Sequence, residues 1–158
     1  MTAVDAVALV DRVVAAHNQR DTEALATCYA AGATFSMDAW QTPADLATWS
    51  GALDALRESF PDLVLRRERV ASGEGVVVAE VRMTGTNTGP INLGTVDRLV
   101  LHTDTHQLPP TGRVMDVVGL VLMELDREVV AERHHWPEVD ILVQLGLVSL
   151  GDPVEVAR

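Results

Sequence analysis

Cysteine is nearly absent from this sequence. The single cysteine, Cys28, excludes a disulfide within the chain and a zinc site built from several thiolates. A free cysteine usually packs as a small buried hydrophobe, and we expect Cys28 to do so on a helix. The fold must therefore be held together by an apolar core.

Positive charge and long apolar runs are also scarce. Lys and Arg number 12 against 23 Asp and Glu, which gives a net charge of -11. Such a protein repels the phosphate backbone that dominates affinity for nucleic acids, so we expect no nucleic-acid partner. No apolar run approaches the roughly 20 residues that cross a bilayer, and Asp5 and Asp11 stand where a signal peptide would carry basic residues. We expect a cytoplasmic protein without membrane contact.

The sequence does contain enough apolar material for one globular domain. Its 158 residues are 47% hydrophobic and 22% charged. A chain of this length buries roughly 70% of the surface that its unfolded form exposes. Neither internal repeats nor a linker divide it, so we predict a single domain over residues 1–158.

Helical periodicity marks the beginning of the chain. A first helix ends near Arg20, and Asp21 is a suitable N-cap for a second helix that ends before Gly32. Spacings of three and four place one stripe of the first helix toward the core, and its members are Val7, Val10, Val14 and His17. A histidine is therefore carried inward.

A short strand and a third helix follow. The strand is predicted over residues 34–40. Thr42 then provides an N-cap and Pro43 a first helical residue, and the helix ends at about Phe60 because Pro61 cannot continue it.

From residue 63 the pattern changes to that of β-strands. Two hairpins are predicted, and their strands cover residues 63–70 with 76–86, and 114–125 with 129–136. A last short helix over 139–145 is stopped by Gly146. Helices first and antiparallel strands afterward indicate an α+β fold.

Four segments, in this order and spacing, resemble the SnoaL-like branch of the nuclear-transport-factor-2-like superfamily. They are Phe60-Pro61-Asp62-Leu63, Thr84-Gly85-Thr86-Asn87-Thr88-Gly89, Pro109-Pro110-Thr111-Gly112-Arg113 and Gln144-Leu145-Gly146. The resemblance implies a cone-shaped barrel, in which a strongly bent antiparallel sheet packs on N-terminal helices around one apolar pocket. It also implies a homodimer that pairs through its sheets.

Family members with known chemistry close rings in polyketide assembly by aldol condensation, without metal or cofactor. Others on this fold isomerise ketosteroids, open epoxides, form ethers or only bind a small molecule, so the fold implies a pocket and leaves the reaction open. We expect a cofactor-independent cyclase of secondary metabolism, including antibiotic biosynthesis, that acts on a small apolar substrate. The alternatives are an isomerase, an epoxide-opening hydrolase or a binding protein.

The standard catalytic residue of the ring cyclases is missing. The resemblance implies an aspartate seven residues before the Gln-Leu-Gly, two residues after a histidine, and this chain has Pro137 there while His135 keeps the histidine position. A second polar pair of the cyclases would fall at Val121 and Met123, which cannot move protons and are expected to line the pocket. Ring closure helped by shape and by one mild acid or base is therefore the expected chemistry.

Strand alternation divides residues 129–136 between two faces. Arg133 and His135 lie on one face, and Glu132, His134 and Trp136 lie on the other. The resemblance favours the first face for the pocket, which makes His135 the expected proton-transfer group, with Arg133 or Asp38 setting its charge state. In the alternative interpretation, His135 and Arg133 make ordinary hydrogen bonds at a strand end, and His134 is expected to be exposed or at an interface.

Four further residues are candidates for the pocket wall. His17 is either a core histidine or a pocket group. Asp38 is either a partly desolvated carboxylate suited to proton transfer or a turn aspartate that faces water. Trp40 and Trp49 pack in the core or supply the wall of an aromatic ligand site.

Two further features of the sequence lie outside this set. Two pairs of histidines could in principle bind a metal, His134 with His135 and His102 with His106. Neither pair lies in a helical pattern, so no metal site is expected. The segment 87–110 is long, rich in proline and without periodicity. We predict that it is a mobile lid over the pocket mouth.

Overall fold

The protein is described by a computed structural model that covers residues 3–38, 40, 42–92 and 105–149. Helix α1 spans Ala3–Gln19 and the short helix α2 spans Thr22–Ala26. Strand β1 spans Tyr29–Met37, and helix α3 spans Leu46–Ser59. None of the described helices is long and apolar enough to cross a membrane.

Strands make up most of the remaining chain. Strand β2 spans Val64–Gly73, β3 spans Val76–Thr86, β6 spans Val114–Asp126 and β7 spans Glu128–His135. A small separate sheet pairs β4 (Ile91–Asn92) with β5 (Gln107–Leu108). Helix α5, Glu138–Gln144, closes the described chain.

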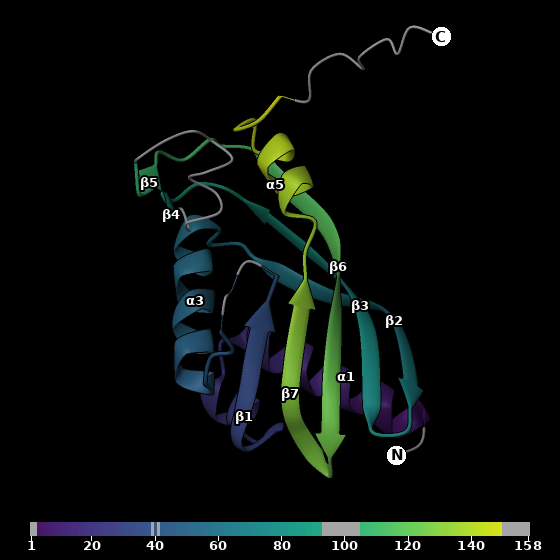
Figure 1. The fold of residues 1–158 in the computed structure, drawn as a ribbon. Helices are drawn as coiled ribbons and strands as arrows, with labels where there is room; N and C mark the ends of the chain where they lie inside the picture. The colour runs from purple at the N-terminus through teal and green to yellow at the C-terminus, as the bar shows by residue number, and fades with distance from the viewer. Residues whose placement is uncertain (1–2, 39, 41, 93–104, 150–158) are drawn as a thin grey trace, which may run out of the picture.

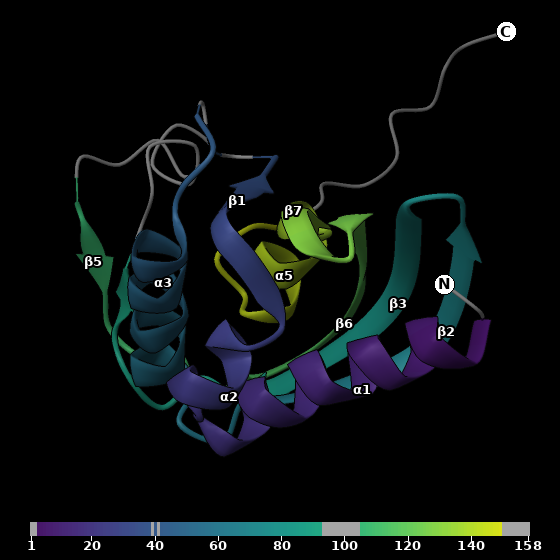
Figure 2. The same cartoon turned by 90° about the horizontal axis from the view of Figure 1, so that it is seen from below.

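The main sheet has the order β1-β7-β6-β3-β2, in which β1 runs parallel to β7 and the other neighbours are antiparallel. Figures 1 and 2 show this sheet strongly curved, with α1 and α3 on its concave side and α5 near one end. The predicted α+β fold is confirmed.

Alternation along β3 and β6 defines the inner face of the sheet. Every second residue of both strands is buried, whereas the intervening residues are half-buried or exposed. The buried residues include Val77, Ala79, Val81 and Met83 on β3 and Met115, Val117, Val121 and Met123 on β6. Because these side chains cover the concave face, they form the floor of the hollow between sheet and helices.

Three predicted boundaries were wrong. The strand predicted over residues 34–40 is β1, Tyr29–Met37, so it begins five residues earlier. Helix α2 ends at Ala26, and Gly32 lies inside β1 with φ 82, where the pairing of β1 with β7 shifts register between Tyr29 and Thr34. Glycine adopts this left-handed conformation without a steric penalty, so the residue serves an irregular strand and not a helix end.

The start of α3 also differs from the prediction. Its N-cap is Asp45, whose side chain accepts a hydrogen bond from the backbone N–H of Thr48 at 2.8 Å. Thr42 and Pro43 cannot begin the helix, because Ala44 exchanges two backbone hydrogen bonds with Phe35, at 2.8 and 2.7 Å, and is therefore extended.

Candidate active site

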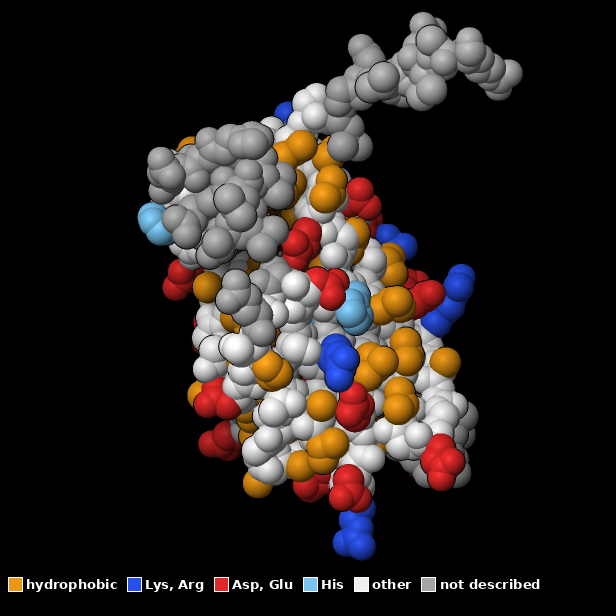
Figure 3. Space-filling view, viewed as in Figure 1, with side chains coloured by type: hydrophobic (Ala, Val, Ile, Leu, Met, Phe, Trp, Pro, Cys, Tyr) orange, Lys and Arg blue, Asp and Glu red, His pale blue; other side chains and the backbone are white. Residues whose placement is uncertain are grey.

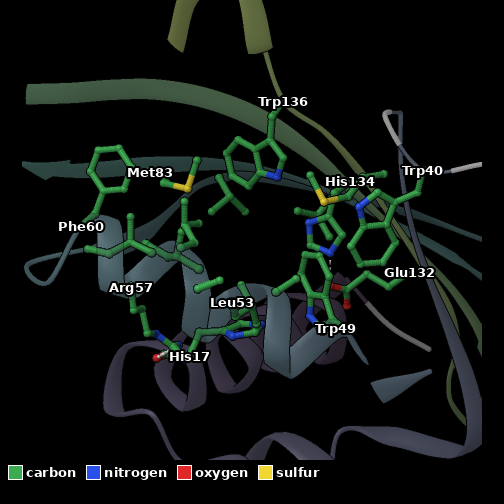
Figure 4. A pocket seen from close by; sticks show the side chains of 18 of the residues that line it. His17, Trp40, Trp49, Leu53, Arg57, Phe60, Met83, Glu132, His134 and Trp136 are labelled. Atoms are coloured by element: carbon green, nitrogen blue, oxygen red, sulfur yellow. Dashed lines mark hydrogen bonds and ion pairs between the residues drawn. The ribbon is translucent and has the colours of Figure 1, made fainter. Parts of the chain in front are cut away.

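A cavity of about 1470 Å³ occupies the hollow between the sheet and helices α1, α3 and α5. Figure 4 shows side chains converging on it from several elements. Aliphatic and aromatic side chains supply most of the wall, as is usual for sites that hold small organic molecules. Buried polar groups are concentrated on a few residues, and these define the chemistry that the cavity can support.

The central polar feature is a pair of side chains from β7, Glu132 and His134. Nε2 of His134 lies 2.6 Å from Oε1 of Glu132, and the side chains are 6% and 1% exposed. The ring N–H does not point along the line between these two atoms, and the contact becomes an ion pair when the ring is protonated. The two residues are two positions apart in the strand and therefore share its inner face.

Tyr29 completes this cluster from the start of β1. Its hydroxyl donates a hydrogen bond of 2.6 Å to Oε2 of Glu132. Burial raises the pKa of Tyr29 well above its ordinary value, and the neighbouring Glu132 charge raises it further. The phenol therefore stays protonated, and its hydroxyl orients the carboxylate by donating a hydrogen bond to it.

Glu132 is held as a carboxylate despite its burial. Loss of hydration raises its pKa, but the interaction of the carboxylate with His134 and the hydrogen bond from Tyr29 together outweigh this effect, so the pKa of Glu132 lies below its ordinary value. Among the described residues, it is the one buried acidic side chain. A buried carboxylate beside an imidazole can hold the ring in place and stabilise its protonated form.

Aromatic rings fix the position of His134. Trp49 of α3 stacks on the imidazole with 4.3 Å between ring centroids and 30° between ring planes. Phe35 stacks on Trp49 at 5.8 Å, and Trp40 meets it edge-on at 5.8 Å. Nδ1 of His134 has no partner among the described residues, and Figure 4 shows this nitrogen on the side of the ring away from Glu132.

His17 lies in the opposite wall, near the end of α1. Burial lowers its pKa from 6.5 to about 4, although the charge of Glu132 opposes the change. The backbone carbonyl of His17 accepts a 2.6 Å hydrogen bond from Arg57 of α3. At neutral pH His17 is therefore an uncharged polar group fixed between two helices.

The expectation that Arg133 and His135 face the pocket was wrong. Their side chains are 59% and 48% exposed. Arg133 pairs with Glu124 at 3.4 Å, and Nδ1 of His135 pairs with the exposed Asp38 at 2.7 Å. The predicted association of His135 with Asp38 exists, but Asp38 is at the cavity rim and its partner is on the outer face.

A β-bulge explains this reversal. Leu125 pairs with Val129 and Glu124 pairs with Ala131, so Val130 is an extra residue without a partner in β6. An extra residue shifts the side-chain alternation by one, and every residue after it changes face. Val129 is buried as the pattern predicted, whereas beyond the bulge the buried residues become Glu132 and His134.

The structure places five other candidate residues in the cavity wall. The side chains of His17, Trp40, Trp49, Val121 and Met123 all line the cavity. Their binding of a ligand stays a prediction. Sequence reasoning missed Glu132, His134 and Trp136 as a set, although their shared parity was a signal that all three lie on one face.

Metal binding receives no support from the part of the chain that the structure describes. No three His, Cys, Asp or Glu side chains there are grouped to hold an ion. His134 and His135 point to opposite faces of β7, and His102 lies outside the described residues.

Comparisons with known proteins agree with this geometry. The model of the SnoaL-like domain matches residues 10–133. A search of curated proteins found no match.

Solved structures with the same fold include three bacterial proteins. AclR of Streptomyces galilaeus, provisionally named a hydroxylase, is 18% identical with a TM-score of 0.75, over 97% of this chain and 92% of its own. IdmH of Streptomyces antibioticus, provisionally named a polyketide cyclase, is 21% identical with a TM-score of 0.70, over 89% and 98%. A SnoaL-like protein of Jannaschia, also provisionally named a polyketide cyclase, is 20% identical with a TM-score of 0.73, over 92% and 94%. These similarities establish the fold alone.

Proposed function

Since this chain belongs to the SnoaL-like domain family, we propose that it is a cytoplasmic, cofactor-independent cyclase of secondary metabolism. It folds a flexible, largely apolar substrate inside the cavity and promotes ring closure by confinement and by acid–base catalysis. The single observation that carries this proposal is the buried pair of Glu132 and His134 in the cavity wall.

His134 is the group that exchanges protons with the substrate. Imidazole both accepts and donates a proton near neutral pH, and Nδ1 of this ring is left without a protein partner. As an enol oxygen of the substrate attacks a carbonyl carbon, Nδ1 takes the hydroxyl proton and returns it to the carbonyl oxygen. A new carbon–oxygen bond forms, the carbonyl becomes a hydroxyl group, and the ring leaves the step neutral again.

Glu132 acts through His134. Its carboxylate lies beside Nε2, so it stabilises the imidazolium that forms when Nδ1 takes a proton. Tyr29 holds the second carboxylate oxygen and keeps the acid from turning toward the substrate. Confinement contributes separately, because holding the two ends of a flexible chain together removes much of the entropy cost of cyclisation.

The rival functions receive less support from the site. Epoxide opening needs a pair of acids in the cavity. Besides Glu132, the carboxylates that border it are Asp38 and Asp45, which are exposed at its rim, and Glu138, which is half-buried at the start of α5, so Glu132 is the one fully buried acid among the described residues. A protein that only binds an apolar ligand has no need of a buried pair of titratable side chains, because removing such a pair from water costs free energy.

Ring closure of a model substrate tests the proposal. A linear diaryl 1,3,5-triketone closes to a pyranone by oxygen attack and loss of one water, and absorbance follows the reaction. The wild-type protein should accelerate this closure, and His134→Gln should lose about a hundredfold of the acceleration, as removal of a general acid or base does.

His135→Gln is the matched control. It makes the same chemical change one residue further along β7, on the outer face. It should retain the wild-type rate. A loss in His135→Gln with an unaffected His134→Gln would contradict the proposed site, and equal rates in all three proteins would contradict acid–base catalysis by either histidine.

A further inference from the structure

The cavity has two chemically different lobes. One is surrounded by the core cluster that contains Phe35, Trp49, Val121 and Met123, and it holds the buried Glu132 and His134. The other is surrounded by a separate core cluster made of Phe60, Met83, Ile91, Met115, Val117 and Leu145. Figure 4 shows Phe60, Met83 and Arg57 on one side of the cavity and Trp40, Trp49, Glu132 and His134 on the other. The guanidinium of Arg57 donates a hydrogen bond to the backbone carbonyl of His17, so the remaining wall on its side is apolar in character. We call these the polar lobe and the aliphatic lobe.

The sheet places the boundary between the lobes at one residue of β6. On its inner face, Val117 belongs to the aliphatic cluster and Val121 to the polar-lobe cluster, with Gly119 between them. On β3, Val81 pairs with Gly119 and belongs to the first cluster, whereas the next inner residue, Met83, belongs to the second. The boundary therefore crosses both strands at the position of the glycine.

Trp136 occupies the space that this glycine leaves. A Cβ built at Gly119 would overlap the indole, with the Cδ2 atom of Trp136 only 2.7 Å away. Trp136 packs against both core clusters, and Figure 4 shows its ring between Met83 and His134. The indole is the wall residue that both lobes share, because Gly119 has no side chain to exclude it.

We propose that the cavity takes an elongated ligand lengthwise, with its polar reacting end beside His134 and an unreactive hydrocarbon part in the aliphatic lobe, and that Trp136, seated on Gly119, determines which ligands reach both lobes. The orientation rests on the proposed function, which places the chemistry at His134. The division into lobes rests on the packing of the sheet. The substrate class is a molecule with an oxygenated or aromatic head and an alkyl or alicyclic extension.

A homologous series of aryl ketones measures how binding depends on the length of the hydrocarbon part. Acetophenone, hexanophenone and decanophenone share one aromatic ketone head and differ only in chain length. Quenching of the cavity tryptophans reports binding of each compound. Each methylene that enters an apolar lobe should strengthen binding about fourfold, so affinity should rise steeply along the series in the wild-type protein.

Filling the aliphatic lobe should remove this dependence. Met83→Trp adds a large side chain there and should weaken decanophenone binding at least tenfold, while acetophenone binding changes by about twofold or less. Thr84→Trp is the matched control, because it adds the same side chain to the adjacent residue of β3, on the opposite face. It should preserve the affinity gradient.

Gly119→Ala tests the boundary residue. The added methyl group displaces the indole, so decanophenone binding should weaken about tenfold with little change for acetophenone. In a Trp136→Leu protein the same glycine substitution should have little further effect, because the ring that it displaces is gone. This coupling separates a steric effect through Trp136 from general damage to β6.

Two results would overturn the proposal. The first is an affinity that does not rise from acetophenone to decanophenone in the wild-type protein. The second is a rise that Met83→Trp leaves unchanged, which would place the chain elsewhere. Failure of the proposed function looks different: ring closure would be insensitive to His134→Gln while the chain-length dependence stays intact. Absence of binding by all three ketones counts as the first of these results, and it leaves the proposed function to be decided by the rates of ring closure.

Discussion

Replacing His17 with glutamine tests how the buried polar wall of the cavity affects stability. His17 has a pKa of about 4 in the folded protein and 6.5 in the unfolded chain, because burial disfavours its charged form. Between these values the unfolded chain binds a proton that the folded protein does not. Stability from neutral His17 is therefore fully present above pH 6.5 and is lost as the pH falls toward 4.

The size of the effect follows from the two pKa values. Their difference of about 2.5 corresponds to about 3.4 kcal/mol when the loss is complete, and to about 2 kcal/mol between pH 7.5 and pH 5. His17 is 5% exposed, so solvent screening reduces this value little. Because the pKa of Glu132 is lowered, the stability that this carboxylate contributes is present at both pH values and is lost mainly at lower pH.

Urea unfolding at the two pH values is the assay. The wild-type protein should lose about 2 kcal/mol more than His17→Gln on going from pH 7.5 to pH 5, whatever the glutamine costs at neutral pH. His106→Gln, a change at an exposed position, should behave as wild type.

A second measurement does not depend on a variant that folds. The ring signals of His17 in wild-type NMR spectra should not titrate until the pH approaches 4. Equal losses of stability in wild type and His17→Gln, or a His17 titration near pH 6.5, would refute the reasoning and show that water reaches the ring.

Three further predictions concern other parts of the molecule. Asn87 is fully buried, and its side chain donates hydrogen bonds to the carbonyls of Ser59 and Gly89 and accepts hydrogen bonds from Thr111. Asn87→Ala should therefore lower the free energy of unfolding in urea by about 2 to 4 kcal/mol, and a loss below about 0.5 kcal/mol would contradict this account. Hydrophobic side chains gather on the outer face of the sheet (Figure 3), where Val118 and Leu120 are 40% and 44% exposed. Light scattering should therefore report a dimer that Leu120→Glu dissociates. Particles of 17 kDa in the wild-type protein would exclude this dimer. A lid is predicted over residues 87–110, of which 93–104 lie outside those that the structure describes. Amide hydrogen exchange in this segment should be faster than in Val76–Thr86, and equal protection of the two segments would argue against a lid.

Local pattern predicted most of the architecture. Spacings of three and four located α1, and alternation located β3 and β6 close to their observed limits. The resemblance carried by short motifs supplied the family and the cavity, and both were confirmed. These features depend on residues close together in sequence, whose side-chain periodicity is set by the helix or strand itself.

Features that depend on pairing between strands were not predictable in this way. The start of α3 depends on the bridge between Phe35 and Ala44, which keeps Pro43 out of the helix. The boundary at Gly119 depends on a tryptophan that comes from the end of the neighbouring strand. In both cases a contact from elsewhere in the fold decided what a local residue does.

The candidate acid–base group shows most clearly which features follow from the sequence alone and which depend on the tertiary structure. The sequence by itself determined that Glu132 and His134 share one face of a strand and that Arg133 and His135 share the other, because side chains alternate in any strand. Only the tertiary structure decided which face meets the cavity. Val130 is left unpaired where β7 bends against β6, and this one extra residue reverses the alternation that begins correctly at Val129. A bulge arises from the register between two strands, so no pattern within one strand reveals it.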